Sequence, residues 1–332
     1  MKQRALGATG LLVSEVAFGC GTTADLMING APAARRAAVQ RALDLGINYF
    51  DTAPLYGNTA SETNLGACLK DLEATPIIAT KVILGPENLD DIADAVRQSV
   101  IQSAARLQVQ TLPLVQLHNR IGMQRAAKAD VGAAPLLDME DVFGADGVLE
   151  AFDWLRQRGI VQHIGCCAYG GETPALEKTI DSGAFDTVLV SYSMANSSAF
   201  DAHVSHPAIK NYQGIAARAH ARGMGVIALR ALEAGKLTRS DFVVSASASL
   251  GDRELAKAAQ SLCRLLEVQN LPLVSTATRF ALTESRIATL LVGISDIRHV
   301  EEAVDASMNG ALDASVLSTI RDHKIAMLQG AA

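Results

Sequence analysis

Residues 43–51 read LDLG-INYFD, in which one glycine joins the end of an amphipathic helix pattern to a short apolar strand pattern. The same order occurs three more times, in WLRQRG-IVQHIG (154–165), TIDSG-AFDTVLV (179–190) and AHARG-MGVIAL (219–229). The glycine at each junction suits the left-handed conformation that ends a helix, and these residues are Gly46, Gly159, Gly183 and Gly223. Strands that are apolar on both faces are typical of a parallel sheet covered by helices, so the repeat predicts an α/β fold.

Further strand patterns bring the total to eight, and they cover residues 16–19, 47–51, 76–81, 112–118, 161–165, 187–191, 225–229 and 289–293. Helix patterns fill the intervals, for example 33–45, 61–72 and 89–107, and Thr59 with Glu62 forms a candidate capping box before the second of these. Eight βα units without a Pro/Gly/Ser-rich linker favour a closed (β/α)8 TIM barrel over a doubly wound sheet. The loop AFGCGTTADLMING (17–30) also lacks the third glycine of the motif that a Rossmann fold would place there.

We expect a single domain over residues 1–332, in which 1–15 form a β-hairpin that plugs the bottom of the barrel, 16–310 the barrel and 311–332 a C-terminal helix. Three loops are long, and they span 119–146, 193–210 and 231–251, after the fourth, sixth and seventh strands. In a TIM barrel these loops lie on the C-terminal face, where active sites are built. Their length predicts a ligand site there, and tolerated surface insertions are the alternative.

The composition excludes several classes of protein. The chain has 332 residues, of which 49% are apolar, so it can bury a large core and is neither disordered nor a disulfide-stapled miniprotein. Its net charge is −6 and its Lys and Arg residues form no basic run, which argues against a nucleic-acid partner. No apolar stretch approaches the roughly 18 residues that cross a bilayer, and the N-terminus lacks a signal-peptide pattern, so we expect a cytoplasmic protein without membrane contact.

Cysteine usage gives no sign of a metal site. The five cysteines include no C-x-x-C pair, and the seven histidines form no H-E-x-x-H motif. Cys166 and Cys167 are adjacent, and adjacent cysteines rarely reach relaxed disulfide geometry. We therefore expect two buried thiols at this position and no bound metal, with a redox pair as the alternative.

Ionisable residues stand at the ends of three successive strand patterns. Asp51 ends INYFD, Lys81 ends PIIATK and His118 ends LPLVQLH, while Tyr56 follows Asp51 by five residues. Neighbouring strands of a sheet lie roughly 5 Å apart, so these side chains can converge at the top of a barrel. A buried salt bridge between Asp51 and Lys81 would explain two of the four residues without chemistry, but it leaves Tyr56 and His118 unexplained.

The four residue types suit proton transfer to a carbonyl group. Tyrosine has a pKa of about 10, and we expect the Lys81 cation to lower it by stabilising the phenolate. Asp51 can hold the Lys81 ammonium, and His118 can donate a hydrogen bond to the carbonyl oxygen while Tyr56 supplies the proton. None of these side chains can supply a hydride to the carbon, so a nicotinamide cofactor is implied.

The segment GINYFDTAPLYGNTASETNLGACL (46–69) closely resembles the signature of the aldo-keto reductase superfamily, and the strand ends ATK and VQLHN resemble its lysine and histidine blocks. The similarity extends over essentially the whole chain, from RALGATGLLVSEVAFGCG (4–21) to LLVGISDIRHVEEA (290–303). The resemblance implies an NAD(P)-dependent oxidoreductase on a (β/α)8 barrel, with Tyr56 as general acid/base and Asp51, Lys81 and His118 completing the catalytic set. This agrees with the chemistry of the residues themselves.

The nicotinamide positions of the family are only partly matched. Where the family often has Gly-x-Ser-Asn to hold the carboxamide, this chain has Gly-Cys-Cys-Ala at 165–168, which leaves Cys167 at a weakened anchor. Leu189 replaces a common glutamine, and Leu229 stands where a ring-stacking aromatic often ends the seventh strand. Asn119 and either Ser191 or Tyr192 are the other candidate contacts to the nicotinamide, and each is equally explained by facing the substrate or by packing.

Phosphate and adenosine contacts are expected after the last two strands. Arg230, Gly235 and Lys236 are candidate pyrophosphate contacts, although Lys236 is equally explained as a solvated side chain. The resemblance places adenosine contacts at Gly293, Ser295, Asp296, Arg298 and Glu302. Asp296 stands where many family members carry arginine, and a carboxylate repels a 2′-phosphate while it accepts from ribose hydroxyls, so we expect NAD rather than NADP. Arg298 and His299 are close enough along the chain to reverse this preference.

The expected partner is a small carbonyl or alcohol substrate, such as an aldehyde, a ketone or a sugar. Asn119 and Tyr192 are candidate substrate contacts, with simple packing as the other explanation. Two alternatives to this oxidoreductase remain. One is a barrel isomerase or lyase in which Lys81 forms a Schiff base. The other is a cofactor-binding regulatory subunit with little turnover, like the potassium-channel β subunits of the same superfamily.

Overall fold

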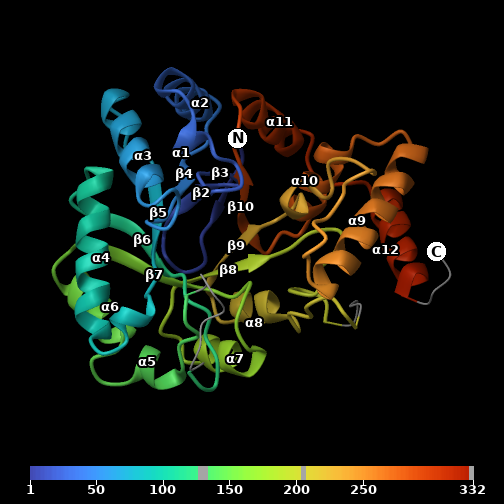
Figure 1. Ribbon diagram of the computed structural model, residues 1–332. Coiled ribbons are helices and arrows are strands. Elements are labelled where there is room, and N and C mark those ends of the chain that lie inside the picture. Colours follow the sequence, from blue (N-terminus) through green and yellow to red (C-terminus); the bar gives the residue numbers. More distant parts are fainter. Residues whose placement is uncertain (126–133, 203–206, 329–332) are drawn as a thin grey trace.

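The computed structural model describes residues 1–125, 134–202 and 207–328, and the strands within them form a parallel barrel. The barrel strands are β3 (Val16–Gly19), β4 (Tyr49–Asp51), β5 (Ile77–Val82), β6 (Leu112–Leu117), β7 (Val161–Cys167), β8 (Thr187–Ser191), β9 (Gly225–Leu229) and β10 (Ile287–Gly293). Each strand pairs with the next along the chain, and β10 returns to pair with β3 (Figure 1). The predicted (β/α)8 TIM barrel is therefore confirmed.

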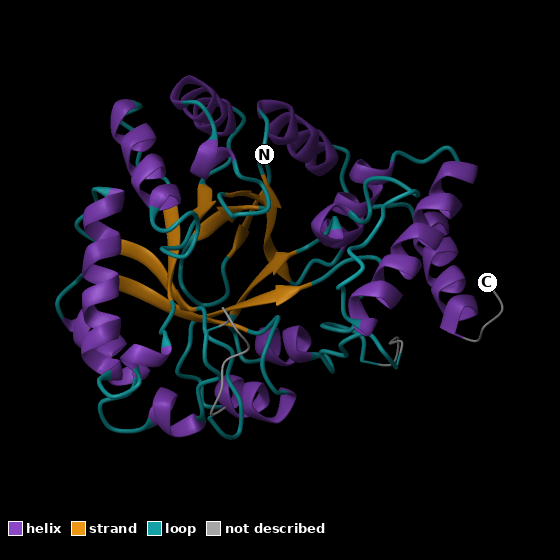
Figure 2. Cartoon of the chain, viewed as in Figure 1, coloured by secondary structure: helices purple, strands orange, loops and turns teal. Residues whose placement is uncertain are grey.

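Helices surround the orange strands in Figure 2, and the ring contains α1 (Leu26–Asn29), α2 (Pro32–Asp44), α3 (Ala60–Asp71), α4 (Ile92–Leu107), α5 (Met139–Phe143), α6 (Val148–Gln157), α7 (Thr173–Asp181), α8 (Ile215–Ala221), α10 (Leu273–Thr283) and α11 (Ile297–Met308). Outside this ring, α9 (Leu250–Val268) and α12 (Ala314–Leu328) pack against each other. Short 3-10 turns occur at η1 (Pro86–Asn88) and η2 (Glu233–Gly235). The helix-ending glycines all have positive φ, as predicted, and they are Gly46, Gly159, Gly183 and Gly223.

The N-terminal hairpin closes the bottom of the barrel. Its strands β1 (Gln3–Ala5) and β2 (Leu12–Ser14) pair antiparallel. Leu6 and Val13 are fully buried in the cluster that fills the barrel interior. At Gly7, which has φ +56°, a Cβ would lie 2.2 Å from the amide nitrogen of Gly225, so the hairpin backbone meets the start of β9 directly. The expected plug is thus present.

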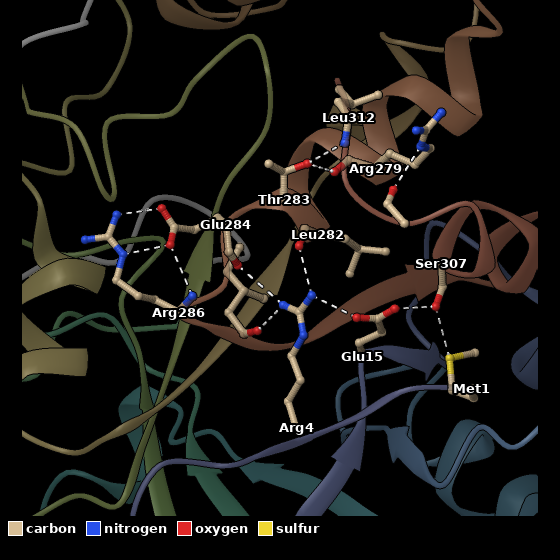
Figure 3. Close-up of polar contacts among 12 residues, drawn as sticks. Met1, Arg4, Glu15, Arg279, Leu282, Thr283, Glu284, Arg286, Ser307 and Leu312 are labelled. Atoms are coloured by element: carbon tan, nitrogen blue, oxygen red, sulfur yellow. Dashed lines mark hydrogen bonds and ion pairs between the residues drawn. The ribbon is translucent and has the colours of Figure 1, made fainter. Parts of the chain in front are cut away.

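Arg4 ties this hairpin to the end of α10 (Figure 3). Its guanidinium donates to the carbonyl oxygens of Leu282 at 2.9 Å and Ile287 at 2.7 Å, and it pairs with Glu15 at 2.8 Å. Glu15 is buried and also accepts from the Ser307 hydroxyl of α11 at 2.6 Å. Leu282 lies in the last turn of α10, where carbonyls lack intrahelical partners, and Ile287 begins β10. Arg4 therefore joins the hairpin to α10 and β10, and its partner Glu15 reaches α11.

The predicted capping box at α3 is wrong. Thr59 is the N-cap, but its φ is 74° and its side chain makes no capping hydrogen bond. Glu62 is fully buried, accepts from the Thr80 hydroxyl at 2.5 Å and pairs with Arg106 at 2.7 Å. A buried carboxylate requires such partners, so Glu62 connects α3 to β5 and α4 instead of capping its own helix.

Cys166 and Cys167 are buried thiols, as predicted. Strand β7 continues to Cys167, two residues beyond its predicted end, so the two side chains alternate across the sheet. Cys166 packs between the barrel and the helices, while Cys167 belongs to the interior cluster. All five cysteines are free. Within the described residues, no group of His, Cys, Asp and Glu side chains is arranged to hold a metal ion.

The three long loops follow β6, β8 and β9, so they lie at the C-terminal end of the barrel as predicted. Residues 126–133 and 203–206 of the first two loops lie outside the described residues, as do 329–332 of the expected C-terminal segment. Met194 and Leu237, from the second and third loops, are buried in one cluster with α9 and α12. The outer helix pair therefore supports the loops that surround the mouth of the barrel. None of the helices described is long and apolar enough to span a membrane.

Candidate active site

Three neighbouring strands present Asp51, Lys81 and Gln116 to one buried point. The Lys81 ammonium donates to Asp51 Oδ1 at 2.5 Å and to the carbonyl oxygen of Thr52 at 2.9 Å. The Gln116 amide donates to Asp51 Oδ2 at 3.3 Å. All three side chains are buried, and Lys81 is entirely inaccessible. Asp51 and Lys81 therefore form the ion pair that the strand ends suggested.

Tyr56 and His118 lie beside this ion pair. The Lys81 nitrogen is 5.1 Å from the centre of the Tyr56 ring. The rings of Tyr56 and His118 meet edge to face with 6.0 Å between their centres. A Cβ at Gly21, in the loop after β3, would contact the Tyr56 ring at 3.8 Å. The four residues predicted from the strand ends are thus gathered at one place in the barrel mouth.

The protonation of Tyr56 differs from the prediction. Burial raises the pKa of Tyr56 to about 12, and the nearby charge of Lys81 only partly offsets this effect. Lys81 does lower the pKa of the phenol, as expected, but the net shift is upward because burial has the larger effect. Desolvation penalises the phenolate more than one neighbouring cation stabilises it. At neutral pH Tyr56 is a phenol and a proton donor.

Lys81 is charged and His118 is neutral. Burial alone would lower the pKa of Lys81, but the carboxylate of Asp51 raises it above its usual value. Burial, and then the charge of Lys81, lower the pKa of His118 to about 3. Its Nδ1 is buried and has no hydrogen-bond partner among the residues described. A neutral imidazole carries one N–H, so His118 can donate one hydrogen bond to a ligand.

A cavity of about 670 Å³ adjoins this group at the ends of β7, β8 and β9. Its lining includes Tyr169, Ser191, Asn196, Lys210, Tyr212, Arg230, Glu233 and Asp252. The Tyr169 ring lies edge to face with His118, 6.3 Å between centres, and the Arg230 guanidinium is 5.8 Å from the centre of the same ring. Tyr169 therefore separates the catalytic candidates from the cavity, whose volume suits a small ligand.

Of five contacts predicted for the nicotinamide and the pyrophosphate, two line this cavity and three do not. Ser191 is buried at the end of β8, and Arg230 follows β9 with φ +68°. Cys167 is buried in the interior cluster next to Tyr169. Gly235 lies in η2 with φ +90°, and Lys236 donates to a backbone carbonyl of that turn at 3.3 Å. The structure therefore favours Ser191 and Arg230 over the other three residues as cofactor contacts.

The predicted adenosine contacts lie together after β10, outside the lining of that cavity. Gly293 ends β10, Ser295 and Asp296 precede α11, and Arg298 and Glu302 belong to its first turns. Asp296 caps α11 by accepting from the Arg298 amide at 2.9 Å, and it pairs with the Arg298 guanidinium at 2.9 Å. This pairing weakens the repulsion of a phosphate that the sequence argument assigned to Asp296.

The two predicted substrate contacts have structural roles instead. Asn119 is buried, and its amide accepts from the Leu84 amide at 2.8 Å and donates to the carbonyls of Leu84 at 3.0 Å and Pro135 at 3.2 Å. Tyr192 packs against two phenylalanine rings whose centres lie 5.2 and 5.7 Å away. Neither residue lines the cavity. The hydrogen bonds of the buried Asn119 amide are used within the fold, and Tyr192 packs among aromatic rings, so the structure favours the packing explanation for both residues.

The sequence interpretation missed Gln116, Tyr169, Lys210 and Tyr212. The sequence could have identified Gln116 as a site residue, because Gln116 precedes His118 by two residues and side chains two positions apart face the same side of a strand. Tyr212 had no such signal in the sequence, since the loop after β8 must fold back before the Tyr212 hydroxyl can donate to the Tyr169 carbonyl at 3.3 Å. The cavity wall is therefore a product of loop folding.

Comparison with known proteins agrees with this geometry. The family model for the Aldo/keto reductase family matches residues 15–325. L-galactose dehydrogenase of Arabidopsis thaliana is 30% identical over 310 residues, which cover 91% of this chain and 87% of that protein. A 6-dehydroglucose reductase of Novosphingobium aromaticivorans is 40% identical over 126 residues, or 35% of this chain and 40% of that protein.

Solved structures show the same fold. An aldo-keto reductase from Bacillus halodurans in its holo form superposes with a TM-score of 0.73 and 23% identity, covering 97% of this chain and 96% of that chain. With the family match over almost the whole sequence, the chain belongs to the aldo/keto reductase family, a family of oxidoreductases.

Proposed function

We propose that the protein transfers a hydride between a nicotinamide cofactor and a small polyhydroxy carbonyl compound or alcohol, with Tyr56 as general acid/base. The observation that carries this proposal is the buried Lys81–Asp51 ion pair beside Tyr56, with the neutral ring of His118 next to it. A sugar-like substrate is supported by the names of two relatives, a galactose dehydrogenase and a dehydroglucose reductase.

In the reducing direction, Tyr56 donates its phenolic proton to the substrate oxygen, and the Lys81 ammonium stabilises the phenolate that remains. Asp51, supported by the amide of Gln116, holds the ammonium in place. The single N–H of His118 donates to the same substrate oxygen and orients the carbonyl. In the oxidising direction these roles reverse, and the phenolate of Tyr56 accepts the proton of the alcohol.

The residues around the cavity fit a dinucleotide. The cofactor supplies the hydride when it is bound. Arg230 is exposed and is not part of any ion pair among the residues described, so its charge is free for a phosphate group. We assign Ser191 and the Tyr169 ring to the nicotinamide end and the segment after β10 to the adenosine end. We keep NAD rather than NADP as the proposed cofactor because of the Asp296 carboxylate at the start of α11, although its pairing with Arg298 weakens this preference.

The ion pair also argues against the Schiff-base alternative. A lysine must be neutral to attack a carbonyl, whereas Asp51 raises the pKa of Lys81 and keeps the ammonium charged. Lys81 is therefore an electrostatic partner of Tyr56 and not a nucleophile.

Turnover with each nicotinamide form tests the proposal. The pure protein is assayed with NADH, NADPH and their oxidised forms against aldehydes, aldoses and sugar alcohols. We expect turnover that falls about 10²- to 10⁴-fold in Tyr56→Phe. Tyr192→Phe, at a packing tyrosine outside the cavity, is the matched control. Equal activity of wild type and Tyr56→Phe would contradict the proposal, and cofactor binding without turnover would favour a regulatory subunit.

A further inference from the structure

We infer that Arg120 and Lys210 form a subsite for an anionic group of the substrate. The substrate of the proposed reaction is then a polyhydroxy carbonyl compound or alcohol that carries a carboxylate or a phosphate. This inference rests on the proposed function and adds the charge of the molecule on which it acts.

Both cations lie over the short loop that follows β7. The Lys210 ammonium donates to the Gly171 carbonyl at 2.8 Å and lies 5.5 Å from the centre of the Tyr212 ring. Arg120 covers Gly170, where a Cβ would lie 2.8 Å from Arg120 Cγ and 3.0 Å from its Cδ. Lys210 lines the cavity, and Arg120 contacts the adjacent residue of the same loop, although the two residues are 90 positions apart in the sequence.

Neither charge has a carboxylate partner within the described part of the chain. Desolvation of the ammonium, and then the charge of Arg120, lower the pKa of Lys210. The acidic groups of the cavity wall have other partners, since Glu233 accepts from the Ser193 hydroxyl and Asp252 from the Ser249 hydroxyl. Two adjacent cations without an anion are unfavourable, and a bound carboxylate or phosphate removes this repulsion.

The subsite lies within reach of the catalytic group. Arg120 follows His118 by two residues, and Lys210 lines the same cavity as Tyr169, whose ring contacts His118. A sugar-sized molecule with its carbonyl at Tyr56 and His118 therefore directs its far end towards Arg120 and Lys210. Arg230 belongs to a different strand end, after β9, where we place the cofactor phosphate.

The test compares matched substrates that differ in charge. Values of kcat/KM are measured with D-glucuronate, D-glucose 6-phosphate and neutral D-glucose at saturating cofactor, for wild type, Arg120→Gln and Lys210→Gln. We expect the preference for the anionic compounds to fall about tenfold in each variant, which is the effect of losing one charge-assisted hydrogen bond. Arg264→Gln, at an exposed arginine of α9 outside the cavity lining, should keep the wild-type preference. A larger loss of kcat/KM with glucuronate identifies a carboxylate site. A larger loss of kcat/KM with glucose 6-phosphate identifies a phosphate site.

An unchanged ratio of anionic to neutral kcat/KM in both variants would overturn the inference, as would a loss confined to the affinity for the cofactor. Calorimetric titration with D-gluconate, and with neutral D-glucitol as its control, gives a second measurement that needs no turnover. If no compound turns over, the proposed function fails, and gluconate binding alone decides the subsite. Binding that weakens about tenfold in Arg120→Gln supports the subsite, and absent or unaffected binding rejects it.

Discussion

The two directions of the proposed reaction should respond differently to pH, because Tyr56 acts as an acid in one and as a base in the other. Its pKa of about 12 keeps the phenol protonated throughout the neutral and mildly alkaline range, so reduction should be independent of pH there. Oxidation needs the phenolate, whose fraction is about 10⁻⁵ at pH 7 and about 10⁻³ at pH 9 for such a group. We therefore expect kcat/KM for oxidation to rise about 100-fold between these two pH values.

The assay measures initial rates in both directions with saturating cofactor at constant ionic strength. Tyr56→Phe serves as the control, since it removes the titrating group and should remove the slope together with most of the activity. Replacing the cation in the double variant Asp51→Asn/Lys81→Met should move the rise of the oxidation rate to higher pH, because the Lys81 charge lowers the pKa of Tyr56. Both substitutions are made together so that no charge is left buried without a partner.

An oxidation rate that is constant from pH 7 to 9 would refute this reasoning, as would a slope that survives in Tyr56→Phe. A reduction rate that falls above pH 7 would mean that the pKa of Tyr56 lies inside the assay range. In that case the cation of Lys81 would outweigh the desolvation of the phenol, contrary to the order of effects in the structure.

Three further predictions concern residues around the site. Arg4→Met should lower the free energy of unfolding by about 3 kcal/mol in urea titrations, since Glu15 then remains buried with only a hydroxyl partner; a loss below about 1 kcal/mol would contradict the role of Arg4. Because the pKa of His118 is about 3, the rate of reduction should not change as the pH falls from 7 to 5, and an inflection near 6.5 would show a protonated imidazole. Asn119→Ala should cost about 2 kcal/mol of stability without a selective change in substrate KM, and a selective rise in KM would restore Asn119 as a substrate contact.

The barrel was predictable because its signals are local. Glycine is the residue that most easily adopts the left-handed conformation that ends a helix, as at Gly46 and Gly159, and the next strand begins within a few positions. The catalytic candidates were predictable for the same reason, because Asp51, Lys81 and His118 lie within one residue of the ends of strands that pair with one another. The capping box at Thr59 failed because tertiary contacts engage Glu62 more strongly than its own helix terminus does.

The sequence alone determined which residues stand at the mouth of the barrel, since strand order and strand ends follow from spacing along the chain. Only the tertiary structure decided the protonation states of those residues. The pKa of Tyr56, for example, depends on the balance between burial, which raises it, and the charge of Lys81, which lowers it. It also decided which side chains form the cavity. Asn119 and Tyr192 turned inward to pack, while Lys210 and Tyr212 arrived from a loop that folds back over β7. Burial and loop closure depend on residues that are far apart in the chain, so a local sequence pattern cannot predict either of them.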